Sequence, residues 1–144
     1  ILCHIFQISL PPPPSTPSHE RMTCSQASEP SFPPRPALLL DTDMGADCDD
    51  AGALAMLHHL ADAGETDILG VVHSSAGRMP WGVGVCAAIN AHHGRPDLPL
   101  AAYRGTDVGE PADKLFAEDI ARDTARHGHT ITRAEEAEDA LALY

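Results

Sequence analysis

The stretch "ALLLDTDMGADCDDAGALAML", from Ala37 to Leu57, decides how this chain folds. An apolar run stands directly before an acidic segment, and a run rich in alanine and leucine follows directly after it. Five aspartates lie within ten residues: Asp41, Asp43, Asp47, Asp49 and Asp50. Close carboxylates repel one another and burial penalises each charge further, so some of these groups must hold a proton or share a cation.

The residues around this stretch alternate between strand-like and helix-like segments. Ala37–Leu40 is a short apolar run typical of a buried parallel strand, and Asp49–Gly64 has helical periodicity with a glycine stop. Two further predicted strands, Thr66–Val72 and Leu98–Tyr103, flank a second predicted helix, Trp81–His93. The order β-α-β-α-β predicts an α/β fold with a doubly wound, Rossmann-like and mostly parallel sheet.

Beyond Tyr103 the periodicity is weaker. Asp113–Arg126 has the composition of a helix, and "TRAE" at Thr132–Glu135 has the spacing of a capping box. This spacing predicts a last helix from Arg133 to the end of the chain. No further strand is expected there, so we expect the sheet to be truncated after about three strands.

The first 36 residues differ in composition from the rest. They contain nine of the 13 prolines, including Pro11–Pro14, mixed with serine and threonine. We therefore expect residues 1–36 to be a proline-rich disordered leader, and residues 37–144 to be the N-terminal part of an α/β domain. The apolar opening Ile1–Leu10 is too short to span a membrane and lacks the basic region of a signal peptide, so no membrane partner is expected. Because the chain begins with isoleucine, we expect a fragment, with Met22 as a candidate natural start.

Charge and cysteine content exclude some classes of protein. The formal charge of −12 falls entirely within residues 37–144, since the first 36 residues carry two acidic and two basic side chains. A domain this acidic is a poor candidate for binding nucleic acid. The four cysteines have neither CxxC spacing nor a paired Cys/His pattern, so zinc is not expected. Reduced cysteines favour an intracellular compartment, with the cytoplasm slightly preferred.

The aspartates are placed where an α/β fold binds its ligands. Asp41 and Asp43 end the first predicted strand, and Asp49 and Asp50 begin the first predicted helix. Ligands of open α/β sheets bind at the carboxyl ends of the strands. A carboxylate cluster without cysteine or histidine indicates a hard cation, Ca²⁺ or Mg²⁺. An EF-hand is excluded, because the loop lacks the required spacing of ligands and glycine.

The complete pattern D-T-D-M-G-A-D-C-D-D-A-G-A-L resembles the N-terminal signature of the inosine–uridine preferring nucleoside hydrolase family. The stretches "ILGVVHSS" and "AAINAHHGRPDLPLAA" are similar to that family's second strand, second helix and third strand. The resemblance covers Ala37 to about Gly105. It implies Ca²⁺-dependent hydrolysis of the N-glycosidic bond of ribonucleosides, which yields ribose and free base for purine or pyrimidine salvage.

The resemblance also implies a role for most of the aspartates. Asp43 corresponds to the catalytic carboxylate that touches the metal and accepts the proton of the attacking water. Asp50 corresponds to the main metal ligand from this loop. The ribose-binding carboxylate corresponds to Asp49 or to Asp47, because two extra residues separate the loop glycine from the aspartate pair.

Three further residues are candidates for secondary roles. Asp41 is expected to orient the loop, with indirect metal contact as an alternative, and Arg78 stands near the position of a sugar-facing asparagine in the family. His73 ends the second predicted strand and faces the same crevice, whereas the remaining histidines are expected to be structural or solvated. The chain is under half the family's usual length, so activity, with a ribonucleoside as substrate, and homo-oligomer formation are expected of the full-length protein. The 144 residues alone are expected to be inactive and to bind Ca²⁺ weakly.

Two other interpretations remain open. An apolar strand followed by D-x-D is also the outline of a Mg²⁺-dependent phosphatase of the haloacid dehalogenase type, with Asp41 as the nucleophile. The second interpretation is that the chain is a non-catalytic, degenerate homologue that binds only a cation or a partner.

Overall fold

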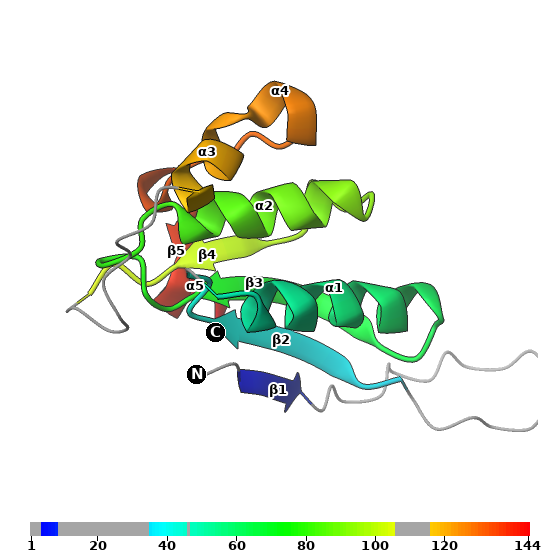
Figure 1. Cartoon of the computed structure of the whole chain (residues 1–144). Coiled ribbons are helices and arrows are strands. Elements are labelled where there is room, and N and C mark those ends of the chain that lie inside the picture. Colours follow the sequence, from blue (N-terminus) through cyan, green and yellow to red (C-terminus); the bar gives the residue numbers. More distant parts are fainter. Residues whose placement is uncertain (1–3, 9–34, 46, 106–115) are drawn as a thin grey trace, which may run out of the picture.

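The computed structural model describes residues 4–8, 35–45, 47–105 and 116–144, which are arranged around one five-stranded sheet (Figure 1). The strands follow one another across the sheet in chain order: β1 (His4–Ile8), β2 (Ala37–Thr42), β3 (Asp67–His73), β4 (Leu100–Ala102) and β5 (Glu138–Asp139). β1 runs antiparallel to β2, and all other neighbouring pairs are parallel. The sheet is therefore mixed but mostly parallel, and the predicted α/β class is confirmed.

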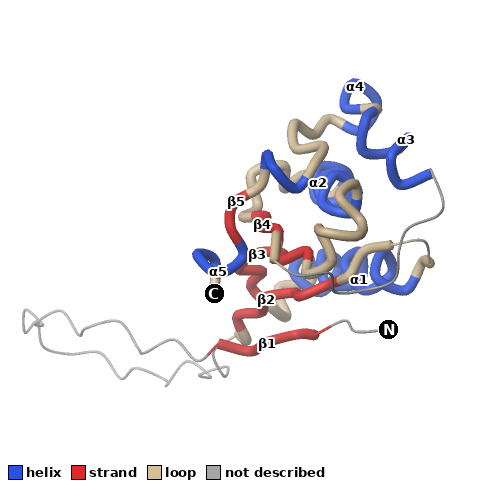
Figure 2. Tube along the Cα trace, turned by 90° about the vertical axis from the view of Figure 1, so that its left-hand side faces the viewer, coloured by secondary structure: helices blue, strands red, loops and turns tan. Residues whose placement is uncertain are grey.

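The two long helices lie on the same face of this sheet. α1 (Asp49–Asp62) connects β2 to β3, and α2 (Gly82–His92) connects β3 to β4. Because consecutive strands are laid down in one direction, crossovers of the usual hand place both helices on one side. Among the helices that the structure describes, only the short α5 (Ala140–Leu143) lies on the opposite face, as Figure 2 shows. A doubly wound sheet, as predicted, carries helices on both of its faces; among the described residues, α5 alone supplies the second face.

The core lies between the sheet and these two helices. Its most buried members come from both layers and are at most 2% exposed: Leu40, Leu54, Leu57, Val71 and Val83. Burying an aliphatic side chain of this size contributes about 1.5–3 kcal/mol relative to leaving it in water. A smaller cluster on the opposite face contains Leu39, Val72, Ala101 and Ala140. None of the described helices is long and apolar enough to cross a membrane.

The N-terminal strand β1 was not predicted. Residues 1–36 were expected to be disordered, but His4–Ile8 pairs with β2 over five residues. Phe6 lies opposite Leu39 and Ile5 opposite Leu40, so uncharged apolar residues extend the sheet at its outer edge. Residues 1–3 and 9–34 of the leader lie outside the described residues, as does the start of the helix expected at 113–126.

The C-terminal region also differs from the predicted pair of helices. Asp123 divides the first into α3 (Phe116–Arg122) and α4 (Thr124–His127), because its side chain accepts a hydrogen bond from the backbone of Arg126 and caps the second helix. Both pack near the outer side of α2 (Figure 1).

The prediction of a single helix from Arg133 to the end of the chain is wrong. A 3₁₀ turn (Ala134–Glu136), strand β5 and the one-turn α5 replace it. Glu136, rather than Glu135, accepts the hydrogen bonds from the backbone N–H and hydroxyl of Thr132, at 2.7 and 3.0 Å. The 3₁₀ turn ends at Glu136, and the extended residues that follow pair with β4 as strand β5. Because the sheet has five strands, the expectation of about three strands was also wrong.

Candidate functional site

The carboxyl ends of three parallel strands meet at one edge of the sheet. Thr42 of β2 lies beside His73 of β3, and His73 lies beside Ala102 of β4. The loop after β2 leaves this edge and enters α1 at Asp49. This is the position at which an open α/β sheet binds ligands, so the described residues place the acidic segment where the sequence predicted it.

Thr42 and Asp50 form the centre of this edge. The Thr42 hydroxyl donates a hydrogen bond of 2.6 Å to Oδ1 of Asp50, and both residues are almost completely buried, with 0% and 3% exposure. Asp50 stands in the first turn of α1, where the helix dipole favours a negative charge. The bond therefore fixes one carboxylate oxygen on the buried side and orients the whole group. Sequence reasoning missed Thr42, although its place between two aspartates at a strand end was a usable signal.

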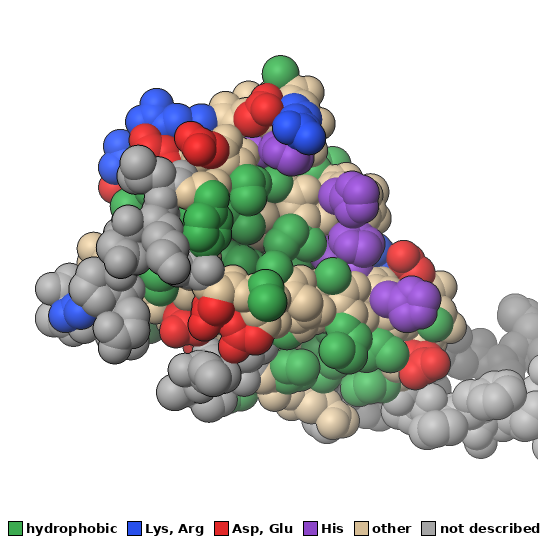
Figure 3. All heavy atoms as spheres, in the orientation of Figure 1, with side chains coloured by type: hydrophobic (Ala, Val, Ile, Leu, Met, Phe, Trp, Pro, Cys, Tyr) green, Lys and Arg blue, Asp and Glu red, His purple; other side chains and the backbone are tan. Residues whose placement is uncertain are grey.

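Asp50 also belongs to a group of three converging carboxylates. One oxygen each from Asp47, Asp49 and Asp50 lie within 4.8 Å of one another. Asp47 and Asp49 are exposed, so the group opens to solvent on one side and is buried at Asp50 on the other. Figure 3 shows acidic side chains gathered at the N-terminal end of α1. An all-oxygen donor set of this kind fits a hard cation.

Burial and neighbouring charges alter the titration of Asp50. Burial, the largest cause, raises the pKa of its carboxyl from 3.8 to about 6, against the opposing effect of the Thr42 hydroxyl. The negative charges of Asp43 and Asp49 raise the pKa further, and so does a hydrogen bond with the Asp43 side chain. Asp43, half-buried in the loop, is therefore an immediate neighbour of Asp50. The expected metal pair Asp43 and Asp50 is brought together, with Asp47 and Asp49 beside Asp50.

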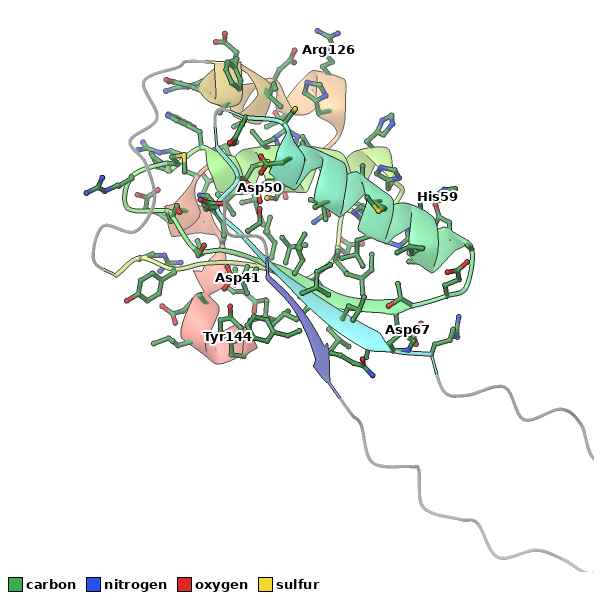
Figure 4. The ribbon with its side chains drawn as sticks, turned by 60° about the horizontal axis from the view of Figure 1, so that its bottom comes forward. Asp41, Asp50, His59, Asp67, Arg126 and Tyr144 are labelled. Carbon is green, nitrogen blue, oxygen red and sulfur yellow. The ribbon has the colours of Figure 1, made fainter. Side chains whose placement is uncertain are left out.

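Asp41 does not join this group. Adjacent side chains of a strand point to opposite faces, so Asp41 points away from the face on which Thr42 contacts Asp50. Its Oδ2 atom instead accepts a hydrogen bond of 2.5 Å from the hydroxyl of Tyr144 in the C-terminal segment. Figure 4 shows Asp41 next to Tyr144, and Asp50 at the beginning of α1. Asp41 thus anchors the end of the chain rather than facing the other carboxylates.

His73 and Arg78 occupy different places around the same edge. His73 is fully buried, and its Nε2 atom lies 2.8 Å from the carbonyl oxygen of Met79, to which it donates as the neutral ring. Burial lowers the pKa of His73, so the imidazole stays neutral and supports the loop after β3. Its Nδ1 atom and the hydroxyl of Ser75 have no hydrogen-bond partner among the described residues. Arg78 lies in the same loop with an exposed side chain.

Two glycines allow the acidic loop to pack closely against α2. A Cβ atom added to Gly82, at the start of α2, would lie 2.3 Å from the carbonyl oxygen of Met44 and 2.6 Å from the His73 ring. A Cβ atom added to Gly45 would lie 2.7 Å from the sulfur of Met79. At Gly82 a larger residue would require movement of the loop backbone, whereas at Gly45 the nearest atoms belong to the end of the flexible Met79 side chain, which can shift. Gly82 is therefore the glycine that the close approach of the loop requires.

No model of a known protein family, no curated protein and no solved structure matches this chain.

Proposed function

We propose that this chain carries the calcium-binding half of a nucleoside hydrolase site, and that the full-length protein cleaves the N-glycosidic bond of ribonucleosides. One observation carries the proposal. Asp50 is buried, oriented by Thr42 and surrounded by Asp43, Asp47 and Asp49 at the carboxyl edge of a mostly parallel sheet. This arrangement agrees with the signature that the chain resembles.

Each side chain receives a specific role under this proposal. Asp50 is the main protein ligand, because its orientation is fixed before any ligand binds. Asp43, its neighbour, binds the same cation and accepts a proton from the attacking water. Asp49 or Asp47, on the exposed side, accepts hydrogen bonds from the sugar hydroxyls. When bound, Ca²⁺ supplies charge that lowers the pKa of a coordinated water and orients the ribose.

The test measures binding and turnover on the same protein. Calorimetry with Ca²⁺ and an assay of base released from inosine and uridine are applied to the full chain that the gene encodes. Asp43→Ala should lower turnover at least about 100-fold, which is the usual loss when a general base is removed. Asp97→Ala, at an exposed aspartate before β4, serves as the control and should leave turnover unchanged.

The alternatives predict different outcomes of the same assays. Ca²⁺ binding without turnover would support the non-catalytic homologue, and retention of activity in Asp43→Ala would overturn the assignment of the base. The phosphatase alternative needs Asp41 as a free nucleophile beside the metal. Because Asp41 is hydrogen-bonded to Tyr144 and points away from Asp50, the geometry favours the hydrolase.

A further inference from the structure

A second polar cluster lies at the opposite ends of α1 and α2 from the carboxylates. Its centre is His58, which is completely buried, whereas the next residue of α1, His59, is exposed. Figure 3 shows histidines gathered at this end of the two helices, and Figure 4 places His59 there, distant along α1 from Asp50. The cluster connects α1 to α2 independently of the metal site.

Both nitrogens of the His58 ring are engaged. Nε2 lies 2.8 Å from Oδ1 of Asn90, a buried side chain of α2, and Nδ1 lies 3.3 Å from an Nη atom of Arg95. A guanidinium donates hydrogen bonds and accepts none, so Nδ1 must be the unprotonated acceptor. Nε2 then carries the ring proton and donates it to Asn90. The contacts therefore specify one neutral tautomer.

The surrounding charges oppose a second proton on this ring. Arg95 donates to Nδ1 and also to Asp62 at 2.5 Å, so the cation is held in place beside His58. The ring of His93 stacks on that of His58, with centroids 4.6 Å apart and an interplanar angle of 7°, and His92 packs edge-on against His93. Asp62 favours protonation, but its charge is largely offset by Arg95.

Protonation would convert the contact from attractive to repulsive. A proton on Nδ1 removes the only acceptor for Arg95 at this ring and places two donors and two positive charges against each other. Burial, which is the largest cause, together with His93 and Arg95 lowers the pKa of His58, against the opposing effects of Asn90 and Asp62. The neutral form is thus required by geometry and favoured by electrostatics.

We propose that His58 is an acid-sensitive latch between α1 and α2. As a neutral ring it joins the C-terminal half of α1 to Asn90 and Arg95, and as an imidazolium it releases them. Acidification below the ordinary histidine pKa therefore loosens this end of α1. The direction follows from linkage: the open form binds more protons than the closed form, so the closed form loses stability as the pH falls.

The latch is tested by hydrogen exchange and by NMR titration of the imidazole. If opening exposes His58 to water with its reference pKa of 6.5, the opening constant rises at most about tenfold between neutral pH and pH 5.5. Protection factors of amides in residues 55–62 should fall by up to that factor. His58→Gln should remove this dependence, whereas His59→Gln, at the adjacent exposed histidine, should retain it. Each variant is compared with the natural protein at the same pH, so that the effect of Asp50 titration on stability cancels.

Two further variants keep the proposal falsifiable if His58→Gln folds poorly. Asn90→Asp places a carboxylate beside Nε2 and should raise the pH at which His58 protonates while the latch stays closed. Arg95→Met removes the opposing cation and should weaken the acid response. Titration of His58 in the intact protein at the same pH as His59, or an unchanged acid response in all three latch variants, would overturn the proposal.

Discussion

The ionised carboxylate of Asp50 is expected to bind the cation but to destabilise the fold in the absence of the cation. Folding raises the pKa of its carboxyl from 3.8 to about 6, chiefly through burial. The native state therefore binds more protons than the unfolded state between these two pH values. Stability falls as the pH rises through this window and is constant above it. This difference in pKa between the folded and unfolded states lowers the free energy of unfolding by about 3 kcal/mol at pH 7.5.

The perturbation is Asp50→Asn. Asparagine has the shape of the protonated acid, its oxygen can accept the Thr42 hydroxyl, and its amide group can donate to Asp43 in place of the lost proton. In the absence of Ca²⁺ the variant should therefore be more stable than the natural protein at pH 7.5, by up to about 3 kcal/mol. Near pH 4 the difference should shrink to about 0.5 kcal/mol, because Asp50 is then almost fully protonated in the native state and partly protonated in the unfolded state.

The assay is urea unfolding at a series of pH values, with a chelator and with added Ca²⁺. Calcium should stabilise the natural protein by mass action and should affect Asp50→Asn much less, since the buried ligand is lost. Asp49→Asn, at the exposed neighbour, controls for the removal of one charge from the same helix turn. The reasoning is refuted if Asp50→Asn is no more stable at pH 7.5, relative to the natural protein, than it is at pH 4.

The remaining predictions concern packing and the end of the chain. Gly82→Ala should cost about 1–3 kcal/mol in urea unfolding, because its Cβ would overlap the carbonyl oxygen of Met44. Gly52→Ala, on the open surface of α1, is the matched control and should stabilise by about 0.5–1 kcal/mol; equal effects of the two changes would contradict the close packing. Tyr144→Phe should cost about 0.5–1.5 kcal/mol through loss of the hydrogen bond to Asp41, and unchanged stability would show that the bond is not formed in solution.

The elements that the sequence predicted well are those encoded by local patterns. β2, α1, β3, α2 and β4 each begin or end within about two residues of the predicted segments. Gly64, the expected stop of the first long helix, has a positive φ angle of 76°, and Gly94, just after the second, has one of 73°. A glycine at this position relieves the strain that other residues meet in the left-handed region. The bounds of these elements are therefore determined by a few consecutive residues at each end.

The elements that were missed depend on partners distant in the chain. β1 has only five residues, and its place in the sheet comes from pairing with β2 some thirty residues later. β5 has two residues, and it lies beside β4 because the 3₁₀ turn directly before it places them at that edge of the sheet. Neither segment is long enough to show a periodicity of its own. Single-sequence reasoning therefore assigned the first to a disordered leader and the second to a helix.

Single positions within a strand explain why the carboxylates were predicted as a group but not individually. Counting acidic residues places five aspartates at one loop, but strand alternation divides them between two faces. Thr42 points toward α1 and binds Asp50, so Asp41 must point the other way, where the chain end supplies Tyr144. Asp43 is two residues beyond Asp41, but it follows the end of β2 and is free to turn back toward Asp50. The end of the strand at Thr42 therefore decides which aspartates can share a cation.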